Sequence, residues 1–395
     1  MASRLPNYLV TATLARSATE SAGPALLVVA VAVLGSATTG SYVAACMSAS
    51  AALAGPVVGA QLDRSRHPRR AFAAFLVLLA VALASVSIVI GRGPLVVVLV
   101  LAAAAGLAYP AITGAWSAQL SRLVPADRLG HAYGYDAATY SIASVAAPPA
   151  AAALVAVYAR APLWMPAVLA LLALLALTRM PLHPRDTGAA PLPLTAALRD
   201  GVRALTRQPA LRRSTVITTV GFAGTAAVFV AAPVLAQDRA GSLQFTGVIL
   251  GTVAAGGVLS SAALTRWPVA RPDRMVIGMT AVGGVCVLAI GLAPTVPLLL
   301  VAAFALGVSE PPLLTAIFQV RIRESPEHVQ SQVFTTAASL RTSAFAAATA
   351  TCGWLLRDSV SAVILFGAGL HLVAVVIGLA AGPPLPPRRH WVRRR

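Results

Sequence analysis

The sequence predicts an all-α membrane protein with twelve transmembrane helices arranged as two six-helix bundles. Apolar residues make up 58% of the chain and charged residues only 11%, which is far from the composition of soluble domains. The apolar residues form long stretches of about the 20 residues that cross a bilayer. Twenty-four of the thirty basic residues lie in alternate connections. Basic loops stay on the cytoplasmic side, so the pattern indicates topology as well.

We expect both termini to be cytoplasmic and the chain to be a multi-pass protein of the cytoplasmic membrane. The longest connection divides the spans six and six. The predicted organisation is an N-terminal bundle (1–180), a cytoplasmic linker (181–213), a C-terminal bundle (214–381) and a basic cytoplasmic tail (382–395). The spans are expected near 8–34, 40–62, 71–91, 94–120, 131–158, 162–180, 214–237, 243–265, 275–292, 296–320, 330–356 and 360–380.

The linker contains one amphipathic stretch. Its apolar side chains recur at helical spacing, and its arginines form a separate stripe: Leu194, Leu198, Val202 and Leu205 against Arg199, Arg203 and Arg207. This pattern fits either a helix on the inner leaflet or a solvated linker helix.

Several function classes are excluded by what the chain lacks. All thirty basic residues are arginine, so there is no lysine to grip phosphate or form a Schiff base. No HExxH, GxSxG or CxxC motif is present, and Cys46, Cys286 and Cys352 lie within apolar stretches. We therefore expect neither an enzyme nor a metal or cofactor site. The positive charge lies in short loops, where it faces lipid headgroups and not nucleic acid.

The two halves repeat a pattern. Gly106 and Pro110 of the fourth span correspond to Gly307 and Pro311 of the tenth, in the same order and at the same spacing. A two-half repeat is the architecture of carriers that rock around a site near the midplane.

The loop after the second span carries a motif. It reads Gly59, then Asp63-Arg64, then the basic pair Arg69-Arg70, and it resembles the Gly-x-x-x-Asp-Arg signature of the major facilitator superfamily. The resemblance implies the major facilitator fold, a glycine that permits close helix approach, an aspartate that contacts the start of span 11, and basic residues that steady the outward-facing state. A carboxylate at a helix N-terminus is indeed stabilised by the helix dipole.

A second segment bears on the branch of the superfamily. Residues 143–151 of span 5, with Pro148, are similar to a Gly-x-x-x-Gly-Pro-x-x-Gly segment of proton-exchanging exporters, with alanine in place of each glycine. The resemblance implies efflux of a drug or metabolite by proton antiport. The arginine that such exporters carry in span 4 is absent, because 99–106 holds only apolar or small residues.

Ionisable residues inside spans mark function, because charge in the bilayer is costly. The resemblance places spans 1, 4, 7 and 10 around a central cavity, with span 5 at its border. We expect Glu20, alone or with Asp136, to carry a proton, with Arg16 keeping Glu20 ionised. The alternatives are a static Arg16–Glu20 ion pair, and Asp136 as a helix cap. Polar residues of the neighbouring spans complete the expected cavity: Tyr109, Thr113 and Tyr140.

Glu310 and Arg341 lie in adjacent spans at similar depth, and we expect a cross-helix pair beside the backbone opened by Pro311-Pro312.

The leading interpretation is a monomeric secondary transporter that exports a small amphipathic or hydrophobic molecule, driven by protons. Mostly apolar cavity stripes suit such a substrate better than a sugar or phosphate. Two alternatives stay open: proton-coupled uptake of a small solute, and a membrane scaffold or sensor that does not transport. The expected partners are the substrate, protons and membrane lipids.

Overall fold

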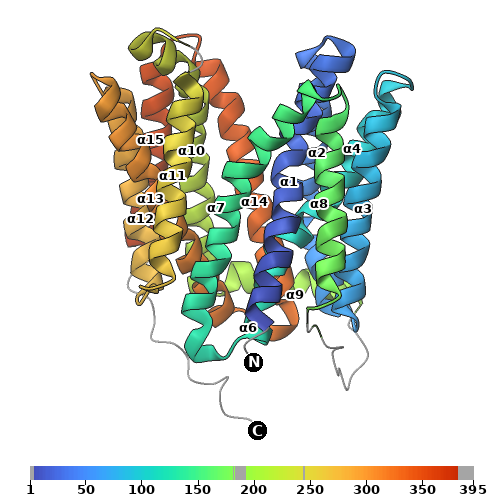
Figure 1. Cartoon of the computed structure of the whole chain (residues 1–395). Coiled ribbons are helices and arrows are strands. Elements are labelled where there is room, and N and C mark those ends of the chain that lie inside the picture. Colours follow the sequence, from blue (N-terminus) through green and yellow to red (C-terminus); the bar gives the residue numbers. More distant parts are fainter. Residues whose placement is uncertain (1–3, 181, 183–192, 243–244, 381–395) are drawn as a thin grey trace.

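Every regular element of the described residues, 4–180, 182, 193–242 and 245–380 of this computed structural model, is helical (Figure 1). The basic tail and part of the linker lie outside these ranges. The first half consists of α1 (Arg4–Leu34), α2 (Ala37–Arg64), α3 (Pro68–Val89), α4 (Leu95–Pro110), η1 (Ala111–Ala115), α5 (Trp116–Ala118), α6 (Leu120–Leu123), η2 (Ala126–Arg128), α7 (Leu129–Ala153), η3 (Leu154–Ala156) and α8 (Ala161–Leu177). The linker contributes α9 (Leu194–Arg207). The second half consists of α10 (Pro209–Ala240), α11 (Phe245–Leu264), α12 (Pro272–Leu292), α13 (Val296–Glu324), η4 (Glu327–Val329), α14 (Gln330–Leu355) and α15 (Val360–Ala380).

The described residues include ten helices long and apolar enough to cross a membrane. The other two expected spans correspond to α8, which is apolar but shorter, and to α14, whose polar face lies against the other half. The chain is thus an all-helical, multi-pass membrane protein.

Helix boundaries follow from local sequence. The Ser36 side chain caps α2 by accepting a hydrogen bond from the Thr39 N–H at 3.1 Å, which satisfies a donor left free at a helix start. Proline in the first turn opens α3, α10, α12 and α13, where its missing N–H is harmless. Gly241 ends α10 with φ of 66°, a conformation that glycine adopts without strain.

The halves repeat each other in packing. In the first half α1 packs on α7 and α8, and α2 packs on α4; in the second half α10 packs on α14 and α15, and α11 packs on α13. The predicted pair of glycines has the same role in both halves. A Cβ at Gly106 would overlap the Met47 carbonyl, and one at Gly307 would overlap the Val253 carbonyl. Both glycines let two helix backbones approach closely.

A π turn interrupts the fourth span. Pro110 lacks a backbone N–H, and η1 follows it directly before α5 continues the span. Wide turns of this kind often occur at functional sites. Here the Tyr140 hydroxyl of α7 donates a hydrogen bond to the Thr113 carbonyl within the turn.

The two halves touch at one end of the molecule and diverge toward the other end (Figure 1). Across the touching end α2 packs on α14 and α7 packs on α11. The linker helix α9 lies at this end and contacts α2, α10 and α14.

One face of α9, formed by Ala197, Gly201, Ala204 and Leu205, is covered by protein, while Val202 of the predicted apolar stripe is 48% exposed. Ala204 and Leu205 form a small core with Leu211, Val329 and Val333. The Gln332 side chain of α14 donates a hydrogen bond to the Leu198 carbonyl at 3.0 Å. The linker helix thereby bridges both halves.

Candidate functional site

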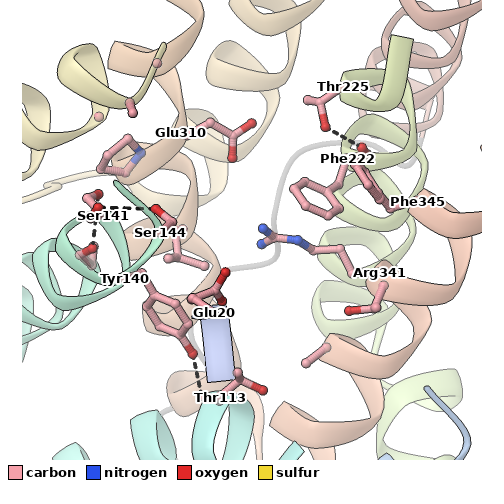
Figure 2. Close-up of a pocket in the computed structure, with 18 of the residues that line it drawn as sticks. Glu20, Thr113, Tyr140, Ser141, Ser144, Phe222, Thr225, Glu310, Arg341 and Phe345 are labelled. Atoms are coloured by element: carbon pink, nitrogen blue, oxygen red, sulfur yellow. Dashed lines mark hydrogen bonds between the residues drawn. The ribbon is translucent and has the colours of Figure 1, made fainter. Parts of the chain in front are cut away.

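A cavity of about 500 Å³ lies between the halves. Helices of both halves line it (Figure 2). Among its lining residues are six that the sequence singled out, namely Glu20, Tyr109, Thr113, Tyr140, Glu310 and Arg341. Arg16 and Asp136 are not among them. The cavity is within the usual size range of small-molecule sites.

Aromatic side chains form much of the cavity wall. Phe222 and Phe229 of α10 both stack near Phe345 of α14, with ring centroids 5.1 and 5.7 Å from it. Phe318 of α13 also lines the cavity, and its ring lies 6.3 Å from that of Tyr140. These rings provide an apolar surface in which a few charged groups stand out.

Glu20 is one of these charged groups. It lies on α1 and accepts a hydrogen bond from the Tyr109 hydroxyl at 3.0 Å. Tyr109 occupies the position in the fourth span that Glu310 occupies in the tenth, so equivalent positions of the repeat face one cavity. Glu20 is thus held by a neutral donor and stays open to the cavity.

Arg16 pairs with Asp136 and not with Glu20. The two side chains are completely buried, with Nη1 and Oδ1 2.7 Å apart. The predicted Arg16–Glu20 pair is therefore wrong. Although Glu20 lies one turn from Arg16, the guanidinium points toward α7 and α5, where it meets a carboxylate and several hydroxyls.

Most polar atoms of this ion pair form further hydrogen bonds. Arg16 also donates hydrogen bonds to Thr139 and, at 2.9 Å, to Ser117. Asp136 accepts from Tyr8 at 2.6 Å and from Ser117 at 2.7 Å. Such a buried pair is stable only when its remaining polar groups are satisfied in this way.

Tyr140 lies between this ion pair and the cavity. The Cζ atom of Arg16 is 3.6 Å from the centroid of the Tyr140 ring, a cation–π distance. The ring itself lines the cavity. Arg16 and Asp136 therefore join α1 to α7 behind the cavity wall, and Asp136 does not cap a helix start.

Glu310 and Arg341 face the same cavity but do not form the expected ion pair, because no side-chain nitrogen and oxygen of theirs approach within 4.0 Å in the described structure. Arg341 instead lies over the Phe222 ring, with Cζ 3.8 Å from the centroid. Its charge still interacts at longer range with Glu310 and Glu20. In Figure 2 the guanidinium extends into the cavity with one of these carboxylates on each side.

Arg321 is a cavity residue that the sequence did not reveal. The span was expected to end at residue 320, with Arg321 in a cytoplasmic loop, but α13 continues to Glu324 and Arg321 is only 3% exposed. Its Cζ atom is 5.6 Å from the Phe334 ring centroid. The available signal was helical spacing, because Glu310, Leu314, Phe318 and Arg321 follow one helix face.

The predicted contact of Asp63 with the start of span 11 is present. Asp63 accepts hydrogen bonds from the backbone N–H groups of Ser331 at 3.1 Å and Gln332 at 2.8 Å. These are free donors in the first turn of α14, so the carboxylate also benefits from the helix dipole. At Gly59, a Cβ would overlap Thr335 and the Gln332 backbone. Gly59 and Asp63 together let α2 dock on α14.

The basic residues of the motif have different surroundings. Arg69 donates hydrogen bonds to the carbonyls of Leu177, Thr178 and Met180, and so caps the C-terminal end of α8. Arg70 is exposed, and Arg64 is partly buried.

Comparison with known proteins agrees with this architecture. Residues 8–349 match the sequence model of the Major Facilitator Superfamily. The chain belongs to the major facilitator superfamily. No curated protein sequence gave a significant match.

Solved transporter structures share the fold at low sequence identity. A variant of the E. coli fucose:proton symporter FucP superposes with a TM-score of 0.76 at 12% identity, over 96% of this chain and 98% of the other. The human organic anion transporter MFSD10 (TETRAN) superposes with a TM-score of 0.74 at 15% identity, over 95% of this chain and 98% of the other. A bacterial homologue of the iron transporter ferroportin, in the outward-facing state, superposes with a TM-score of 0.71 at 16% identity, over 95% of this chain and 98% of the other.

This major facilitator protein is therefore a membrane transporter. Its central cavity lies where the two halves of the superfamily fold meet, as in carriers built from repeats.

Proposed function

We propose that this protein exports a small amphipathic molecule by alternating access in exchange for protons. The observation that carries the proposal is the central cavity, in which aromatic and small apolar residues surround the Glu20 carboxylate. Such a lining favours a partly apolar substrate, while an ionisable group inside a membrane protein marks an ion pathway.

Glu20 is the proposed proton carrier. Unlike Asp136, it is not held by an ion pair within 4.0 Å among the described residues. The charged and titratable groups that act on it are Tyr109, Arg16 and Arg341. Because Tyr109 can donate to the ionised carboxylate and rotate away from the protonated one, Glu20 can exist in both states while facing the cavity.

Export is the proposed direction of transport, and span 5 supports it. If the arginine-rich loops are cytoplasmic, the end closed by α2, α14 and α9 is the cytoplasmic end. The structure is then outward-facing, the state in which an exporter releases substrate and takes up a proton. Pro148 in α7 supports export, since it retains the proline of the segment characteristic of proton-exchanging exporters.

The test is the variant Glu20→Gln in proteoliposomes, with amphipathic dyes as substrates and a pH-sensitive dye inside. We expect proton-driven substrate flux to fall at least tenfold, because glutamine cannot release a proton, while membrane insertion is unchanged. Glu324→Gln, at the end of α13 and paired with Arg323, is the control and should retain full flux. Unchanged proton-coupled flux in Glu20→Gln would remove Glu20 from the mechanism.

A further inference from the structure

Two opposite charges in the cavity lack protein partners. Neither Glu310 nor Arg341 has a side-chain hydrogen bond or ion pair within the described part of the chain. The Arg341 guanidinium lies over an aromatic face, that of Phe222. This contrasts with Arg16, whose guanidinium is bound by a carboxylate and two hydroxyls in the same half of the membrane protein.

We propose that Glu310 and Arg341 bind the two charges of a zwitterionic amphipathic substrate, a molecule with an amine and a carboxylate on an aromatic or aliphatic body. The inference rests on the proposed transport function and names its substrate class.

The chemistry of each residue fits one charge of such a molecule. A guanidinium presents a planar fork of donors that matches a carboxylate, and Arg341 is held against Phe222 with its donors toward the cavity (Figure 2). A glutamate accepts hydrogen bonds from an ammonium group. Since no side-chain nitrogen and oxygen of the two residues approach within 4.0 Å, the two residues form no ion pair with each other, and both line the cavity that a ligand would enter.

A molecule with a single charge would leave the other residue unmatched. Binding displaces the water that solvates a cavity charge, and a polar group left without a partner lowers affinity. A cation would satisfy Glu310 but lie beside Arg341, and an anion would face the opposite difficulty. The rings of Phe222, Phe229 and Phe345 then accommodate the apolar body.

Two roles are thereby divided between two carboxylates. Glu20, with its Tyr109 hydrogen bond, carries the proton, and Glu310 contacts the substrate amine. The zwitterion has no net charge, so it can enter whatever the protonation of Glu20.

The experiment compares four ligands with one apolar body: phenylalanyl-phenylalanine, its C-terminal amide, its N-acetyl form, and the N-acetyl amide. They are zwitterionic, cationic, anionic and neutral. Binding is measured by calorimetry on the purified full chain in detergent, without any proton gradient. We expect the zwitterion to bind about 10- to 100-fold more tightly than each singly charged form, as losing one charge-assisted hydrogen bond implies.

Two variants assign the charges. Arg341→Gln should remove the preference for a free carboxylate, and Glu310→Gln the preference for a free amine. Arg341→Lys should keep the ranking of the four ligands, which shows that the site is intact. The controls Arg323→Gln and Glu324→Gln change the same residue types outside the cavity and should bind as the parent protein does.

Equal binding of the four compounds, binding of none, or a ranking unaffected by Glu310→Gln and Arg341→Gln would overturn the inference. Each of these results is separate from the Glu20→Gln flux measurement. Proton-coupled flux of another amphipath together with equal binding here would leave the proposed function standing and remove only the zwitterion.

Discussion

Arg16 shows what a residue pattern can and cannot predict. The sequence indicated that Arg16 and the carboxylates of spans 1 and 5 matter, but it placed Arg16 with Glu20, one helical turn away. Such pairs stabilise a helix by only about 0.2–0.5 kcal/mol. Asp136 provides an ion pair together with Tyr8 and Ser117, and these contacts depend on how α1, α5 and α7 pack. Periodicity within one helix contains no such information.

Breaking this pair should destabilise the protein strongly. Asp136→Asn would leave Arg16 as a buried, uncompensated charge, which typically costs about 3–5 kcal/mol. The measurement is thermal unfolding in detergent. The matched control is Asp273→Asn, which breaks the partly exposed pair with Arg323 (2.8 Å) and should cost about 0–1 kcal/mol.

The double variant Arg16→Gln/Asp136→Asn removes both charges and should recover part of the loss. Equal stability of Asp136→Asn and Asp273→Asn would contradict the structural role of the pair.

At the scale of elements, the sequence predicted that α9 is a helix, but it did not predict which elements α9 packs against. An amphipathic pattern predicts that one side of a helix packs against an apolar surface. It does not say whether that surface is lipid or protein. The deciding contact involves Gly201, where a Cβ would overlap the Gln332 side chain. A glycine within a helix is usually unfavourable. Gly201 was therefore the feature of the sequence that could have indicated close packing of α9 against protein.

Gly201→Val should weaken the docking of α9 on α14 and shift the population away from the state closed at the α9 end. Overpacking of this kind typically costs about 1–3 kcal/mol. Distances between spin labels at Arg66 and His328, both exposed at this end, should broaden toward longer values. Val202→Ala changes the neighbouring exposed position and should leave the distances as they are. Equal distances in both variants would contradict a role for α9 in holding this end closed.

For the whole molecule, the multi-pass, all-helical architecture followed from the length of the apolar stretches, and the family from Gly59 and Asp63. How the halves meet did not follow. The contacts between α7 and α11 involve small residues such as Gly134, Ser141 and Ser261, which are common throughout this chain. Only the fold selects which of them touch.

A disulfide across this contact should lock the molecule. The Ser141 and Ser261 hydroxyls are 2.9 Å apart, so Ser141→Cys/Ser261→Cys, in a background without Cys46, Cys286 and Cys352, should crosslink under oxidation. Transport in proteoliposomes should then stop and return with reductant, because alternating access requires this end to open. Each single cysteine variant serves as the control; full transport by the oxidised pair would mean that the contact stays closed throughout the cycle.

The π turn at Ala111–Ala115 also fixes the phase of the fourth span. Each residue of a helix advances the direction of the side chains by about 100°. The extra residue in the wide turn thus sets the angle between the segment carrying Gly106 and Tyr109 and the segment carrying Ser117. The contacts of Tyr109 with Glu20 and of Gly106 with Met47 depend together on this angle, so the wide turn couples the cavity wall to the packing of α4 on α2.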